Sequence, residues 1–162
     1  MPGPGTRPVP NLSITAESFD SADARRLVAA LDAGFSDLYL PEQRFGPNLK
    51  AAHLEKGRGM FLVARDGDRA IGCGAVRLLD PITVEIKRMY VEPDYRGRGV
   101  GKAVLDRLEQ AARELGAHRL VLETGVYQEA AIALYRGAGF TSIDCWGQYA
   151  SSATSVCLEK LV

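Results

Sequence analysis

A strand pattern, a glycine-rich bend and a long amphipathic helix follow one another in the second half of this sequence. Apolar residues mark Thr83–Val91 as a strand that Pro93 ends. Gly99–Leu115 then repeats apolar residues at helical spacing, and the short apolar strand Leu120–Glu123 follows. Two strands joined through a helix usually lie parallel in one sheet. The order therefore predicts an α/β domain that contains a parallel strand pair.

The preceding segments predict antiparallel neighbours for this pair. The hairpin signal Asp66-Gly67 joins Met60–Ala64 to Ala70–Leu79, and Asp80-Pro81 turns the chain into Thr83–Val91. Further strands are expected at Leu12–Ala16, Thr141–Ile143 and Ser155–Lys160, and further helices after a cap at Asp20 or Ser21, over Leu49–Lys56 and over Glu129–Arg136.

Together these elements predict one domain over residues 12–162, preceded by a flexible, proline-rich tail over residues 1–11. The fold class is α/β (α+β), with a mixed, mostly antiparallel sheet of about six to seven strands and about four flanking helices.

Composition limits the classes of partner. The chain has 162 residues, of which 46% are hydrophobic and 25% charged, and its formal net charge is zero. A neutral chain gives no electrostatic case for nucleic acid or an anionic membrane as the main partner. It has no apolar run that would span a bilayer and no signal-peptide pattern, so we expect a cytoplasmic protein.

The residues that usually bind metals are sparse. Cys73, Cys145 and Cys157 are widely spaced and form no C-x-x-C pair, so we expect buried thiols rather than a zinc site or a disulfide framework. His53 and His118 have no Ser, Cys or acidic partners at a readable spacing. The sequence therefore predicts neither a metal site nor a catalytic triad.

The bend reads Tyr95-Arg96-Gly97-Arg98-Gly99-Val100-Gly101-Lys102. Its glycines let successive main-chain N–H groups point at one spot, and the helix N-terminus adds partial positive charge there. The bend therefore suits a diphosphate, with added charge from Arg96, Arg98 and Lys102. It is not a Walker loop, because Arg96 and Ala103 replace required residues, and Lys102 breaks the dinucleotide pattern. A structural turn without a ligand is the alternative.

Two motifs resemble the GNAT superfamily of N-acetyltransferases. Arg96-x-x-Gly99-x-Gly101 is similar to the family pattern R/Q-x-x-G-x-G/A. The later stretch Gln128-x-x-Ala131-x-x-Leu134-Tyr135-x-x-x-Gly139-Phe140 resembles N-x-x-A-x-x-L-Y-x-x-x-G-F, with Gln128 in place of the usual Asn. The resemblance is close over about residues 60–161, and small stand-alone bacterial members are the most similar. It implies a GNAT-like sheet in which the parallel pair splays apart.

The resemblance also implies acetyl-CoA as cosubstrate and no metal. Pantetheine would pair with the strand end at Met89, Tyr90 and Val91, and the N–H of Met89 would polarise the thioester carbonyl. Homodimers are common in the family, so a homodimer is compatible with the resemblance. The implied contacts to the rest of the cofactor come from Arg96, Gly97, Arg98, Gly99, Val100, Gly101, Lys102, Gln128, Ala131 and Tyr135.

Acyl transfer to an amine needs a base for the amine and an acid for the leaving thiolate. Tyr135 stands at the family's Tyr position and is the candidate acid; a core aromatic with a tethered hydroxyl is the alternative. Glu85 is the candidate base, acting through water, since a charge in mid-strand is costly without a role or a partner. The alternative is a structural ion pair with Lys87, Arg88 or another strand. In a regular strand Arg88 and Tyr90 would face away from Glu85, whereas a bulge would change that facing.

The acceptor is expected to bind to variable loops. Candidates are Tyr39, Arg44 and Tyr149, besides Glu85. We predict transfer of an acetyl group to a primary amine, on a small molecule or amino acid, by direct attack in a ternary complex. The alternatives are a protein or peptide acceptor, a non-catalytic acyl-CoA sensor and a nicotinamide oxidoreductase.

Overall fold

A seven-stranded mixed sheet forms the centre of the molecule, in the order β1-β2-β3-β4-β5-β7-β6. The structure, a computed structural model, describes residues 7–45 and 49–162. Among the strand pairs of these described residues, only β4 and β5 run parallel, as predicted. The strands are β1 Leu12–Ala16, β2 Gly59–Asp66, β3 Arg69–Asp80, β4 Thr83–Val91, β5 Arg119–Gly125, β6 Thr141–Ile143 and β7 Ser155–Leu161.

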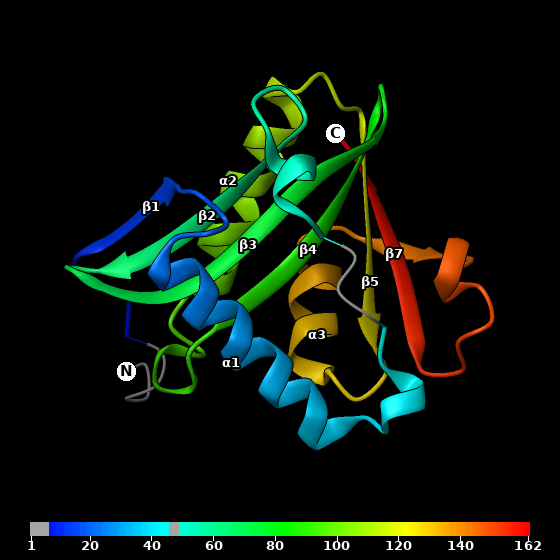
Figure 1. The fold of residues 1–162 in the computed structure, drawn as a ribbon, viewed down its shortest axis with the longest axis horizontal. Helices are drawn as coiled ribbons and strands as arrows, with labels where there is room; N and C mark the ends of the chain where they lie inside the picture. Colours follow the sequence, from blue (N-terminus) through cyan, green and yellow to red (C-terminus); the bar gives the residue numbers. More distant parts are fainter. Residues whose placement is uncertain (1–6, 46–48) are drawn as a thin grey trace.

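Helices cover both faces of this sheet (Figure 1). Helix α1 (Ala22–Leu38) lies on one face, while α2 (Val100–Glu114) and α3 (Glu129–Gly137) share the core on the other. Helix α1 begins where predicted, because the Ser21 hydroxyl accepts a hydrogen bond from the Ala24 N–H at 3.1 Å. The mixed sheet and its covering helices confirm the predicted fold class.

The expected helix over Leu49–Lys56 is wrong. The described residues form three α-helices rather than about four, and this segment contains only the 3-10 turn Ala51–Leu54. Its neighbours explain the difference, since Lys50 and Glu55 both have extended backbone angles and leave less than two helical turns between them.

The predicted tail over residues 1–11 is described only from Arg7 onward, and that part is not a free tail. Val9 is 7% exposed and belongs to the main core. The Arg7 carbonyl accepts a hydrogen bond from Arg98 Nε at 2.9 Å. An apolar side chain and a main-chain contact thus hold this segment to the domain despite its prolines.

The parallel pair separates before its strands end. Its register runs from Thr83 opposite Arg119 to Ile86 opposite Leu122, after which β4 and β5 continue without pairing to each other. In Figure 1 the two strands diverge toward α3. The gap leaves main-chain and side-chain groups of both strands facing a common space.

A bulge interrupts β4 beside this gap. Cys73 pairs with Tyr90 and Ala75 with Lys87, so the single residue Gly74 lies opposite two residues of β4. Arg88 in the bulge has φ 59°, in the left-handed region that non-glycine residues rarely occupy. The extra residue brings Tyr90 to the sheet face that carries Glu85 and Lys87, so the regular-strand expectation for Tyr90 does not hold.

The expectation of three free thiols is also wrong. Cys145 and Cys157 form a disulfide, whereas Cys73 remains a buried free thiol with a pKa that burial raises to about 12. Antiparallel pairing of β6 with β7 places Ile143 opposite Cys157, which brings Cys145 close. The proximity arises from this strand pairing, which cysteine spacing alone does not reveal.

Candidate active site

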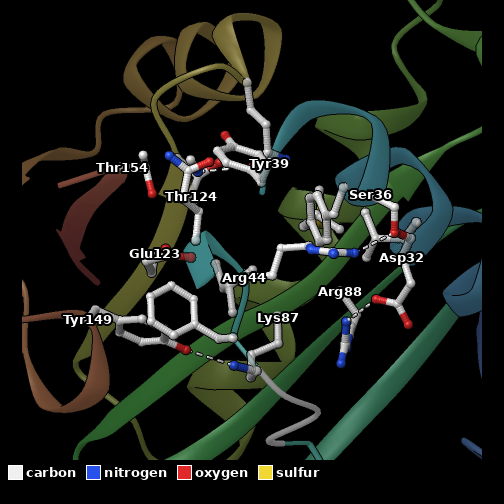
Figure 2. Close-up of a pocket in the computed structure, with 18 of the residues that line it drawn as sticks. Asp32, Ser36, Tyr39, Arg44, Lys87, Arg88, Glu123, Thr124, Tyr149 and Thr154 are labelled. Carbon is white, nitrogen blue, oxygen red and sulfur yellow. Dashed lines mark hydrogen bonds and ion pairs between the residues drawn. The ribbon is translucent and has the colours of Figure 1, made fainter. Parts of the chain in front are cut away.

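A cavity of about 470 Å³ lies between α1 and the separated ends of β4 and β5 (Figure 2). Its walls bring together residues from the beginning, middle and end of the chain. Of the residues predicted for catalysis or binding, it is lined by Tyr39, Arg44, Glu85, Met89, Gln128, Tyr135 and Tyr149. Tyr90, Val91, Ala131 and the glycine-rich bend lie outside its lining.

Glu85 lines this cavity, is 1% exposed, and has partners at both of its carboxylate oxygens. Arg77 on β3 donates to its Oε1 at 3.0 Å, and Lys87 Nζ lies 3.7 Å from its Oε2. The Tyr149 hydroxyl donates to Oε2 at 3.2 Å and accepts from Lys87 Nζ at 3.0 Å. The buried charge is therefore paired, with Arg77 from the neighbouring strand as the closest cation, as buried charges require.

Burial lowers the pKa of Lys87, and the Glu85 carboxylate opposes that effect. Tyr149 connects the two groups, because its hydroxyl contacts both. Tyr149, expected from the sequence in an acceptor-binding loop, is buried at 5% exposure and ties the loop between β6 and β7 to β4.

A second carboxylate, Glu123, faces the cavity from β5. Its Oε2 accepts a hydrogen bond from the Ser155 hydroxyl at 2.6 Å. Burial raises the pKa of Glu123, and the Ser155 hydrogen bond partly lowers it. Lys87 forms no ion pair with Glu123 among the described residues, although its charge also lowers the pKa of Glu123.

Tyr135 reaches the cavity from α3 and is 5% exposed. Its ring packs edge-on against Phe140 at a centroid distance of 5.8 Å. Within residues 7–45 and 49–162 its hydroxyl forms no hydrogen bond. Burial raises the pKa of Tyr135 above its usual range, so its hydroxyl keeps its proton at neutral pH.

The glycine-rich bend presents unused main-chain donors at the start of α2. Gly97 and Gly99 have φ of 74° and 82°, which favours glycine at both positions. The main-chain N–H groups from Gly97 to Lys102 donate no hydrogen bond to any described residue. Gly101 lies against α3, since an added Cβ would be 3.2 Å from Leu134 Cδ2. The bend therefore lies beside the helix that carries Tyr135 and offers a cradle of amides suited to a diphosphate.

The side-chain cations of the bend point to different partners. Arg96 Nε donates to the Val91 carbonyl at 2.9 Å, and its guanidinium lies over the Tyr90 ring. Arg98 lies over the Tyr95 ring, and Lys102 Nζ pairs with Asp106 at 3.0 Å. The common feature of the bend is consequently its main chain, with the cations arranged around it.

Comparisons with known proteins agree with this geometry. Residues 24–140 match the family model described as Acetyltransferase (GNAT) family. An Azospirillum brasilense protein named IAA acetyltransferase is 39% identical over 153 residues, which cover 94% of this chain and 99% of that protein. The chain belongs to the GNAT family of acetyltransferases.

Solved structures of GNAT proteins share its fold. A Klebsiella pneumoniae structure, described as that of an acyl-CoA N-acyltransferase, has a TM-score of 0.79 at 34% identity, covering 93% of this chain and 97% of that one. A GNAT acetyltransferase from Elizabethkingia anophelis with acetyl-CoA bound has a TM-score of 0.68 at 20% identity, covering 94% and 99%. The second likeness shows the fold alone.

In this GNAT acetyltransferase Tyr39 fills the end of the gap between β4 and β5. Its hydroxyl accepts a hydrogen bond from the Tyr127 N–H at 3.1 Å and lies where a Cβ on Gly125 would stand. Burial raises the pKa of Tyr39. Gln128, the residue that replaces the family Asn, accepts from the Gly125 N–H at 2.9 Å through Oε1. Its amide therefore closes the turn after β5.

Several cavity residues of this acetyltransferase were missed as site candidates in the sequence. They are Asp32, Lys87, Arg88 and Glu123. The sequence position of Glu123 could have indicated a binding role, since it ends the predicted strand parallel to Thr83–Val91. Ligands commonly bind at the ends of such parallel strands. No sequence pattern indicated Asp32 or Arg88, because their pairing at 2.9 Å depends on how α1 crosses the β4 bulge.

No helix among the described residues is both long and apolar enough to cross a membrane.

Proposed function

We propose that this chain transfers the acetyl group of acetyl-CoA to a primary amine of a small molecule that binds in the cavity. The observation that supports the proposal most is the adjacency of two features. The separated β4–β5 pair opens onto the cavity, and the unused amides of the bend lie beside α3, whose Tyr135 lines that cavity.

In the proposed reaction the amine nitrogen attacks the thioester carbonyl carbon while acetyl-CoA and amine are both bound. A C–N bond forms, the C–S bond breaks, and the leaving sulfur takes a proton from the Tyr135 hydroxyl. Its buried hydroxyl carries that proton at neutral pH. The β4 bulge interrupts the β3–β4 ladder beside Met89, which supports the proposal that the Met89 N–H polarises the carbonyl.

The amine must lose a proton to a base, and two carboxylates face the cavity. Glu85 is the base proposed from the sequence, and it would act through water. Glu123 competes for this role, because a carboxyl with a raised pKa accepts a proton more readily near neutral pH. Ion pairing of Glu85 with Arg77 and Lys87 favours a positioning role for Glu85.

A small acceptor suits a concave cavity of about 470 Å³, within the range of small-molecule sites. A peptide acceptor is the second candidate, since one side of the cavity is formed by the exposed turn around Arg44.

Steady-state release of free CoA, measured with panels of small primary amines and of peptides, tests the proposal. IAA is tested separately from both panels, because it appears in the name of the Azospirillum relative. We expect turnover with at least one small amine and a rise in melting temperature with acetyl-CoA but not with NADH. Binding of acetyl-CoA without acetylation of any amine would contradict catalysis and leave the sensor reading.

A further inference from the structure

Two guanidinium groups converge on the α1 side of the cavity. Arg44 follows the 3-10 turn Pro41–Gln43, and its Nη1 donates to the Ser36 hydroxyl at 2.7 Å. Arg88 extends from the β4 bulge, and its Nη1 lies 2.9 Å from Asp32 Oδ1. Figure 2 shows the two side chains approaching Asp32 and Ser36 from different elements.

The charges on this wall do not balance. Asp32 is the only carboxylate that Arg44 or Arg88 contacts in the described chain, so two guanidinium groups share one acid. The Asp32 side chain is 56% exposed, and an exposed pair of this kind contributes little. This wall therefore carries net positive charge.

The same wall holds hydrogen-bond donors without acceptors. A guanidinium has five N–H donors, and each of these arginines uses only Nη1 within residues 7–45 and 49–162. The Nε of Arg88 is buried and has no partner there, although buried donors are normally satisfied. A ligand that accepts two parallel hydrogen bonds would match this surplus.

The opposite wall offers one carboxylate, Glu123, that forms no ion pair with a described residue. Glu123 lies on β5 just beyond the last β4–β5 pair, on the side on which the thioester is proposed to arrive, whereas Glu85 lies within the paired segment and is ion-paired with Arg77 and Lys87. In Figure 2 Glu123 and Arg88 lie on different sides of the cavity. A ligand with a cationic and an anionic end would thus find both ends matched, in one orientation only.

Resting on the proposed function, we propose that the acceptor is an amino carboxylic acid, whose carboxylate binds Arg88 and Arg44 and whose amine faces the β4–β5 gap. The carboxylate takes the free guanidinium edges while Asp32 keeps Nη1 of Arg88. Aromatic side chains of Phe35, Tyr39 and Tyr149 line the space between the two walls and suit an apolar carbon skeleton. A simple amine would leave the positive wall without a counter-charge.

Binding of product-like probes tests the subsite without requiring turnover. N-acetylphenylalanine and N-acetylphenylalaninamide, with the glycine and 4-aminobutyrate equivalents, are titrated into the CoA-loaded full chain by calorimetry. We expect at least one carboxylate to bind about tenfold or more tightly than its amide. Equal affinity within each pair, or no binding by any carboxylate, overturns the proposal.

Variants assign that preference to residues. Arg88→Met and Arg44→Met are expected to reduce the carboxylate-to-amide ratio to near one, with Arg88→Lys retaining part of it. Arg25→Met is the matched control, since Arg25 lies on α1 but is exposed and outside the cavity lining. Melting temperatures show whether each variant folds. A ratio that survives in the folded Arg88→Met and Arg44→Met proteins excludes this site.

Turnover separates the two proposals. Comparison of kcat/KM for phenylalanine, phenylalaninamide and phenethylamine should favour the amino acid, mainly through KM. Equal turnover of all three upholds amine acetylation and overturns the carboxylate subsite. Carboxylate-dependent binding without acetylation of any amine upholds the subsite and overturns the proposed function.

Discussion

At the scale of single residues, Glu85 and Glu123 face one cavity from neighbouring strands but have different surroundings. Cations and a phenol surround Glu85, whereas a hydroxyl alone bonds Glu123. A base must be deprotonated to act, so activity should fall as pH drops through its pKa. Because burial raises the pKa of Glu123, we expect the midpoint of the acid limb of the kcat/KM profile to lie above the usual glutamate pKa of about 4.3.

Glu123→Gln should remove this acid limb and lower the rate at neutral pH by about 10²-fold. Ser155→Ala is the matched variant, because it removes the hydrogen bond that lowers the pKa of Glu123. The limb should therefore move to higher pH in Ser155→Ala, a shift that a merely structural role would not produce. An unchanged profile in both variants, with loss of the limb in Glu85→Gln, would return the role of base to Glu85.

Tyr135→Phe tests the proposed acid. Its hydroxyl forms no hydrogen bond to the described residues, so its removal should cost little stability. We expect kcat to fall by about 10²-fold while the dissociation constant of acetyl-CoA stays within twofold, measured by steady-state kinetics and calorimetry. An unchanged kcat with an unchanged melting temperature would instead support the role of a core aromatic.

Sequence patterns could predict cavity-lining residues that stand inside regular strands or helices, but not those whose position depends on tertiary structure. Tyr135 and Glu85 stand inside recognisable strand and helix patterns, and both line the cavity. Arg88 could not be found in this way. Its position depends on the bulge opposite Gly74, and its partner Asp32 lies far away in the sequence.

At the scale of elements, the bend before α2 combines conformation with its proposed binding role. Gly99 is the N-cap of α2 with φ 82°, where a Cβ would meet no atom within 4 Å but would strain the backbone. Gly99→Ala should therefore destabilise the fold by about 1–2 kcal/mol and weaken acetyl-CoA binding. Thermal unfolding and calorimetry with acetyl-CoA measure the two effects.

Gly34→Ala is the matched control for this substitution. Gly34 lies within α1, outside the left-handed region, and a Cβ there would also meet no atom within 4 Å. The change should stabilise the protein by about 0.5–1 kcal/mol and leave acetyl-CoA affinity unchanged. Equal acetyl-CoA affinity in both variants would mean that the conformation of the bend does not matter for binding.

Among the elements, regular periodicity was a reliable guide and irregular backbone was not. Thr83–Val91 and Thr141–Ile143 form strands with the predicted bounds, because alternation and turn residues mark both ends. The bulge left no such mark, since Arg88 in a left-handed conformation has no sequence signal comparable to glycine. The segment around Ala51–Leu54 was apolar enough to suggest a helix but too short to complete one.

At the scale of the whole molecule, the last strands complete the cavity that the earlier strands open. Tyr149 and Thr154 line it from the loop between β6 and β7. The Cys145–Cys157 disulfide closes that loop over a separation of 12 residues. Glu123 pairs in register with Cys157, so the disulfide is attached to the strand beside the proposed base. A link formed late in the chain thus restrains one wall of the site.

Reduction of this disulfide should lower the stability of the fold and weaken acceptor binding at the site. Closing a loop of this length stabilises a fold by about 3 kcal/mol, which corresponds to a melting-temperature change of about 6–12 °C in a chain of this size. We expect dithiothreitol to lower the melting temperature of the wild type by that order and to raise KM for the acceptor, because the loop that carries Tyr149 then loses its covalent link to β7. Cys145→Ala should resemble the reduced wild type and no longer respond to dithiothreitol, whereas Cys73→Ala should keep the response, since Cys73 is a free buried thiol on β3.

Identical unfolding of the wild type with and without reductant would show that the loop is held by side-chain packing, with Phe45 and Trp146 edge-on to Tyr149 as the contacts responsible.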